Sequence, residues 1–154
     1  MRGLVKKSLI SMALAVSSSI YADVNTAMTQ NSGAIVMTEK QYQWTTVPTQ
    51  FISADGVSFA YREYGQQNGG TPVIFLNHLA AVMDNWDPRI IDGIAAKHHV
   101  VIFDNRGIGA STGEPAMSIE QMADDAITFI QAKGFKQVDL SGFSMGGMIS
   151  QEIV

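Results

Sequence analysis

The chain has 154 residues, of which 46% are hydrophobic and 16% are charged, and its formal net charge is −4 at pH 7. This composition is typical of a globular protein with a hydrophobic core, and the length allows one domain at most. The negative charge disfavours a nucleic-acid partner, and the lack of cysteine excludes disulfides, a thiol nucleophile and thiolate metal sites.

The first 22 residues have the three-part layout of a secretory signal peptide. A positively charged start containing Lys6 and Lys7 precedes a moderately apolar run from Ser8 to Ile20. The small residue Ala22 closes the segment, so we expect cleavage after it and export to the periplasm or the medium. The apolar run is too short and too rich in serine for a stable membrane span.

Residues 23–48 are rich in Asn, Thr, Gln and Ser, and we interpret them as a polar leader or linker. The folded domain is expected over residues 49–154. It starts with two strand-like stretches, 50–53 and 57–64, joined by Ala54-Asp55-Gly56. An Asp-Gly pair between two β-rich runs predicts a hairpin, because Gly supplies the positive φ of the tight turn.

Strands and helices alternate after this hairpin. Residues 72–77 and 100–103 are continuous apolar runs, typical of strands that are covered on both faces in a parallel sheet. Asp87-Pro88 predicts the start of a helix between them. A second helix is expected over residues 118–134, which open with a capping box and end in glycine. The alternation predicts an α/β fold with a doubly wound, mostly parallel sheet.

The stretch from Val138 to Met148 predicts a short strand, a sharp turn and a helix. Its centre, Gly142-Phe143-Ser144-Met145-Gly146, fits the G-x-S-x-G pattern of a nucleophile elbow. A serine at such a tip has a strained backbone, and the residues two before and two after it must be very small because they crowd each other. Gly142 and Gly146 hold those places. The helix start offers unpaired N–H groups beside the hydroxyl, so Ser144 is the candidate nucleophile.

From Val57 onward, the chain resembles the N-terminal portion of the α/β-hydrolase superfamily, especially its esterase and lipase-like serine hydrolases. Besides the elbow, Asp104-Asn-Arg-Gly-Ile-Gly-Ala-Ser111 is similar to the family's D-x-R-G-x-G-x-S loop. Leu76-Asn-His-Leu-Ala80, with Trp86 downstream, is similar to the family's H-G-x segment. The resemblance implies a small-molecule ester or similar acyl substrate, an acyl-enzyme on Ser144, and no need for a metal or an organic cofactor.

The resemblance also implies two backbone N–H donors that form an oxyanion hole. The donor that follows the nucleophile is Met145. The other donor follows the family's H-G pair, which this chain replaces. It is Leu79 if Asn77-His78 stand in for that pair, and Ala80 if His78-Leu79 do. Leu79 is preferred because it keeps the family's usual distance to the tryptophan.

In this family the acid and the histidine of the triad follow the nucleophile in the chain. After Ser144 the sequence has ten residues, with Glu152 as their sole carboxylate and no histidine. We therefore expect this chain to be the front part of a longer hydrolase, truncated after the elbow and inactive by itself. Two alternatives stay open: a cofactor-free haloperoxidase or perhydrolase that uses the same serine, and a non-catalytic binding protein of the same fold. The sequence does not indicate an oligomeric state.

One glycine-rich segment superficially matches a dinucleotide fingerprint. It is Gly107-Ile-Gly-Ala-Ser-Thr-Gly113, and Glu114-Pro115 intervenes before any helix. Because the fingerprint must open a helix that meets the pyrophosphate, we interpret the segment as a turn anchored by Asp104 and Arg106, and a redox enzyme is a distant alternative.

The histidines and the paired aspartates favour structural roles. His98 and His99 are adjacent at a strand start and point to opposite faces, which predicts surface residues and argues against joint metal ligation. His78 is interpreted as structural and not as a catalytic base. Asp124-Asp125 predict a solvated helix face, and no H-E-x-x-H spacing is present.

Overall fold

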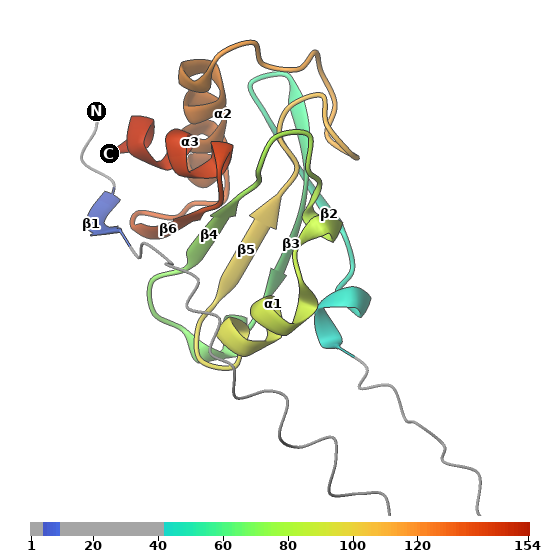
Figure 1. Ribbon diagram of the computed structural model, residues 1–154, viewed down its shortest axis with the longest axis vertical. Helices are drawn as coiled ribbons and strands as arrows, with labels where there is room; N and C mark the ends of the chain where they lie inside the picture. Colours follow the sequence, from blue (N-terminus) through green and yellow to red (C-terminus); the bar gives the residue numbers. More distant parts are fainter. Residues whose placement is uncertain (1–4, 10–41) are drawn as a thin grey trace, which may run out of the picture. The chain divides into compact units, whose positions relative to one another are not determined.

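The computed structural model describes residues 5–9 and 42–154, and these belong to one compact unit. The predicted cleavage site after Ala22 and most of the polar leader lie outside the described residues. A six-stranded sheet with the order β1-β6-β4-β5-β3-β2 forms the centre of this unit (Figure 1). The sheet combines an antiparallel N-terminal hairpin with a set of parallel strands.

The N-terminal hairpin consists of β2 (Gln50–Ala54) and β3 (Val57–Tyr64), which pair antiparallel. Asp55 and Gly56 at the turn have φ angles of 47° and 74°. Two successive positive φ values are what a two-residue hairpin turn needs in order to match the twist of its strands. The predicted hairpin is thus confirmed, and it joins the rest of the sheet through antiparallel pairing of β3 with β5.

The parallel part of the sheet contains β4 (Val73–Leu76), β5 (Val100–Phe103) and β6 (Val138–Gly142). β4 lies between the other two and is parallel to both. All residues of β4 and β5 are buried, as the continuous apolar runs predict for strands covered on both faces. At the far edge, β1 (Val5–Leu9) pairs with β6 in parallel.

Helices cover both faces of the sheet (Figure 1). Ile91 of α1 (Pro88–Ala95) belongs to one hydrophobic cluster together with Phe75. α2 (Ile119–Ala132) and α3 (Met145–Ile153) pack in the other cluster, with Ile74, the strand neighbour of Phe75. Neighbouring strand residues therefore point into different cores, which confirms the doubly wound α/β fold. Within the described part of the chain, no helix has the length and apolarity needed to cross a membrane.

The helix boundaries follow the predicted capping residues. The Asp87 carboxylate accepts a first-turn N–H bond of 2.8 Å at the start of α1. Ser118 Oγ accepts the Gln121 N–H at the start of α2, but the Gln121 side chain bonds the N–H of Met117, so only half of the predicted capping box forms. Gly134 follows α2 with a φ of 75°, the predicted left-handed cap.

A short 3₁₀ helix, η2 (Gln43–Thr46), packs against α1. Trp44 is 2% exposed and belongs to the same hydrophobic cluster as α1. The Asp92 carboxylate on α1 accepts the backbone N–H groups of Gln43 and Trp44, both at 2.9 Å. Residues 43–46 lie before the predicted boundary at residue 48, and they pack on the folded domain.

A charged cluster joins β3, β5 and α2. Lys133 Nζ donates to Glu63 Oε1 at 3.0 Å and to the Tyr61 hydroxyl at 3.1 Å, and His99 Nε2 lies 3.1 Å from Glu63 Oε2. The prediction of two surface histidines is right for His98, which is exposed, and wrong for His99, whose side chain is 13% exposed and paired. The carboxylate of Glu63 holds His99 against the sheet.

Candidate active site

Ser144 lies between β6 and α3, with φ 54° and ψ −116°. It is one of three non-glycine residues with positive φ among those described, the others being Asp55 and Ala80. Such a backbone is held only when its surroundings over-determine it. The Ser144 carbonyl accepts the Gly147 N–H at 2.8 Å, which ties the strained residue to the first turn of α3. The sharp strand-to-helix turn predicted for this stretch is present, and Ser144 is exposed at its tip.

Two glycines allow this turn to close. A Cβ added to Gly142 would lie 2.2 Å from the Gly146 carbonyl oxygen. A Cβ added to Gly146 would lie 1.9 Å from the carbonyl oxygen of Leu76, the last residue of β4. Both distances are far below any allowed contact, so only glycine fits at either place. The elbow is therefore crowded within itself, as predicted, and is also pressed against the end of β4.

Unpaired N–H groups follow both partners of this contact, the elbow and β4. Within residues 42–154, the backbone N–H groups of Met145, Leu79 and Ala80 donate no hydrogen bond. Met145 directly follows Ser144, and the other two follow β4, whose end contacts Gly146. Leu79 and Ala80 are both unpaired, so both stay candidates for the second donor of the predicted oxyanion hole.

Asn77, the residue that follows β4, is completely buried. Its Nδ2 donates to the Phe103 carbonyl at the end of β5, at 2.9 Å, and its Oδ1 accepts the Trp86 indole N–H at 2.7 Å. The Trp86 ring meets the Phe75 ring edge to face, with centroids 4.9 Å apart. Asn77 thus joins two strand ends to the tryptophan and fixes the point where the loop of Leu79 begins.

Apolar side chains surround the elbow. Phe143 and Leu79 are 59% and 71% exposed. The Phe143 ring meets His78 edge to face at a centroid distance of 5.6 Å and Trp86 at 6.5 Å. His78 Nδ1 lies 3.1 Å from the Leu79 carbonyl oxygen. These contacts hold the imidazole of His78 beside the turn. The exposed side chains of Phe143 and Leu79 form an apolar rim around the elbow.

Asp104 anchors the glycine-rich loop, as predicted. Its carboxylate is 2% exposed and accepts the N–H groups of Met83 at 2.8 Å and Ala110 at 3.1 Å. Ser111 Oγ donates to the Asp104 carbonyl at 2.7 Å, and a Cβ on Gly109 would lie 2.2 Å from the carboxylate. Burial raises the pKa of Asp104, against the two backbone N–H bonds that lower it. The side chain couples the glycine-rich loop to the loop that follows β4.

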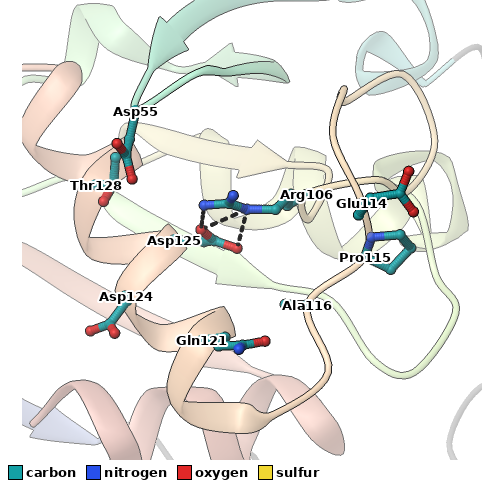
Figure 2. A pocket seen from close by; sticks show the side chains of 9 residues that line it. All are labelled: Asp55, Arg106, Glu114, Pro115, Ala116, Gln121, Asp124, Asp125 and Thr128. Carbon is teal, nitrogen blue, oxygen red and sulfur yellow. Dashed lines mark hydrogen bonds and ion pairs between the residues drawn. The ribbon is translucent and has the colours of Figure 1, made fainter.

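Arg106 anchors the same loop to α2. Figure 2 shows its guanidinium facing the Asp125 carboxylate, to which Nε and Nη2 donate. The prediction of a solvated face is right for Asp124, which is exposed, and wrong for Asp125, which is 6% exposed. The hydrogen bonds to Asp125 raise the pKa of Arg106. The pair borders a cavity of about 430 Å³ that also contains Glu114 and Gln121 in its walls but not Ser144.

A smaller cavity of about 180 Å³ lies beside the unpaired N–H groups. Leu79 and Met145 form part of its wall, and Ile108 and Met122 form another part. Asn105 also lines it, and sequence reasoning missed this residue because it occupies a variable place within the D-x-R-G pattern. In residues 42–154 no group of three His, Cys, Asp or Glu side chains is placed to hold a metal ion.

The family model for the alpha/beta hydrolase fold matches residues 71–153, more than half of the chain. The putative non-heme bromoperoxidase BpoC of Mycobacterium tuberculosis is 29% identical over 99 residues, which are 64% of this chain and 37% of that protein. 3-Oxoadipate enol-lactonase 2 of Acinetobacter baylyi is 31% identical over 101 residues, 65% of this chain and 37% of that protein. An alpha/beta hydrolase fold protein of Chitinophaga pinensis has a similar structure, with a TM-score of 0.68 and 40% identity over 70% of this chain and 39% of that one. The chain therefore spans less than two fifths of the length of these proteins.

The crowding at Gly146 predicts different outcomes for two neighbouring glycines. Gly146→Ala places a methyl group on the backbone of Leu76, and we expect the free energy of unfolding to fall by about 1–3 kcal/mol or more. Gly147→Ala is the matched control, because its Cβ would meet nothing closer than 3.8 Å and alanine favours helix. Urea denaturation followed by circular dichroism measures both. Equal stability of the two variants would contradict the packing of the elbow on β4.

The raised pKa of Asp104 predicts a pH dependence of stability. A carboxyl group with a higher pKa in the folded state binds its proton more tightly there, so its contribution to stability falls as the pH rises from 3.8 through the raised value. Asp104→Asn does not titrate and resembles the protonated acid in shape. We expect the free energy of unfolding of Asp104→Asn, relative to that of wild type, to rise by about 1.4 kcal/mol between acid and neutral pH for each unit by which the pKa of Asp104 is raised. Denaturant titrations of both proteins at several pH values give this difference, and a constant difference would refute the shift.

Proposed function

Since this chain belongs to the α/β-hydrolase family, we propose that it acts as a hydrolase on an ester or similar acyl bond of a small molecule, with Ser144 as the nucleophile. The proteins it resembles include an enol-lactonase. This similarity supports the proposal of a small acyl substrate. The oxyanion hole of this proposal consists of the N–H groups of Met145 and Leu79, with Ala80 as the alternative to Leu79.

The observation that carries the proposal is the strained, exposed Ser144 with an unpaired N–H directly after it. Ser144 has a φ of 54°, and the N–H of Met145 has no partner in residues 42–154. Strained backbone costs free energy and clusters at functional sites, and here the unpaired N–H of a helix start lies directly beside the strained serine.

The proposed reaction follows from this geometry. Ser144 Oγ bonds to the acyl carbon, the carbonyl oxygen becomes an oxyanion held by the two N–H groups, and the proton of Oγ passes to a base. The oxyanion collapses, the alcohol leaves with a proton, and water then releases the acid from Ser144. We propose that a histidine and an acid in the part of the family's length that this chain does not span provide the proton transfers.

A second function is favoured by the similarity to a putative bromoperoxidase. In that case Ser144 forms a peracid from hydrogen peroxide and an acyl donor, and the peracid oxidises bromide. Peroxide-dependent bromination in acetate buffer, faster than ester hydrolysis, would favour this alternative. A non-catalytic binding protein of the same fold would show neither reaction.

We also propose that the protein is exported to the periplasm or the medium. The positive start at Lys6 and Lys7, the apolar run that follows and the small residue Ala22 support this proposal.

The nucleophile is tested with a fluorophosphonate that labels activated serines. In the full-length natural protein we expect one adduct, on the peptide that contains Ser144, and Ser144→Ala should lose both the adduct and at least about a thousandfold in ester hydrolysis. Ser53→Ala, at an exposed position on β2, is the control and should keep both. An adduct that persists in Ser144→Ala would refute the assignment.

Export is tested by the intact mass of the protein purified from its native cells. We expect a mass lower than that of the encoded chain by residues 1–22, so that the exported protein starts at Asp23 and lacks β1 (Val5–Leu9). A protein that retains Met1 and is found in the cytosol would refute export without affecting the assignment of Ser144.

A further inference from the structure

The cavity of about 180 Å³ has one wall in common with the proposed oxyanion hole. Leu79 and Met145 line the cavity, and the backbone N–H groups of the same two residues are unpaired. A substrate whose carbonyl oxygen lies between these N–H groups therefore has the cavity next to its acyl carbon. This placement makes the cavity a receptor for part of the substrate.

The size and the walls of the cavity limit what it can hold. Ile108, Ala116 and Met122 contribute apolar side chains to its walls. Apolar cavities of about 150 Å³ bind a molecule the size of benzene, so this one has room for roughly six heavy atoms. A short acyl chain fits, whereas a long fatty acyl chain does not.

Asn105 adds a polar group to these walls. It is 9% exposed, and its side-chain amide makes no hydrogen bond with any residue of 42–154. The amide atoms of Asn105 are not completely enclosed. Among residues 42–154, Trp44 Nε1 is the one side-chain N or O atom that is both completely enclosed and without a partner. Asn105 is among the residues that line the cavity.

Neighbouring polar groups do not satisfy this amide. Arg106, the next residue, lines the cavity too, but its guanidinium is bound to Asp125. The Asn105 backbone carbonyl accepts the Ile108 N–H at 3.0 Å, which fixes the residue without using its side chain. The Asn105 amide therefore has no protein partner among residues 42–154 while it borders the cavity, which leaves it free to pair with a ligand there.

We infer that this cavity is the acyl subsite of the enzyme and that Asn105 selects a short acyl group carrying a hydroxyl or carbonyl oxygen. The inference rests on the proposed serine-hydrolase function. In the subsite, the apolar walls exclude longer chains and the amide of Asn105 donates to the substrate oxygen. The specificity thus comes from the glycine-rich loop, within the part of the chain that carries the nucleophile.

Two nearly isosteric esters test the role of Asn105 in the full-length protein. The p-nitrophenyl esters of 4-oxopentanoic and 4-methylpentanoic acid differ by a carbonyl oxygen in place of a methyl group. We expect wild type to prefer the oxo ester, and Asn105→Leu to reduce the ratio of the two kcat/KM values about tenfold. Gln131→Leu makes a comparable polar-to-apolar change on the exposed face of α2 and should keep the wild-type ratio.

A second variant tests the cavity itself. Ile108→Trp fills the space from the glycine-rich loop, and we expect pentanoyl esters to lose about tenfold in kcat/KM relative to acetyl esters. This readout does not require the amide of Asn105, so it remains informative if Asn105→Leu folds poorly. Thermal unfolding of each variant shows whether it is folded.

The outcomes separate the inference from the function on which it rests. If wild type is labelled on Ser144 and hydrolyses esters but neither variant changes its selectivity, the subsite is wrong and the hydrolase stands. If wild type is neither labelled nor active, the proposed function fails and the subsite fails with it. A reduced oxo-to-methyl ratio together with the shift in chain length supports the subsite.

Discussion

The contact between Gly146 and the end of β4 is the constraint on which the candidate site depends. The backbone of α3 can approach the Leu76 carbonyl this closely only because residue 146 has no side chain. That approach turns the chain at Ser144 and places the start of α3 beside the loop after β4. One backbone contact therefore sets the turn at Ser144 and the approach of the Met145 N–H to the strand end from which the loop of residues 79 and 80 starts.

Buried polar side chains then hold the loops around this contact. Asn77 joins the ends of β4 and β5 to Trp86, and Asp104 joins the loop after β4 to the glycine-rich loop. Each uses hydrogen bonds to backbone groups that regular strands or helices would otherwise satisfy. The loops at this edge of the sheet thus have fixed positions without secondary structure of their own, and Arg106 extends this network to α2 through Asp125.

The sequence was sufficient to predict the features that depend on local chemistry. The hairpin follows from Asp55-Gly56, the elbow from its two glycines, and the doubly wound sheet from the alternation of apolar runs with capped helices. Pairing over long distances could not be read in the same way. Asp125 is buried because Arg106, 19 residues earlier, reaches it, and nothing in a pair of adjacent aspartates shows which one has a partner. Trp44 was hidden in a polar segment, where a single aromatic residue gives no periodicity.

The two tryptophans of the chain report on different parts of the molecule. Trp44, within η2, is 2% exposed in the same cluster as α1, whereas the Trp86 ring meets Phe143, the residue directly before the nucleophile. The Trp86 indole N–H is bonded to Asn77, at the strand end where the oxyanion loop begins. The intrinsic fluorescence of Trp86 is consequently sensitive to what occupies the elbow, while that of Trp44 follows the integrity of the core, so this chain carries an optical probe of the site and an internal reference.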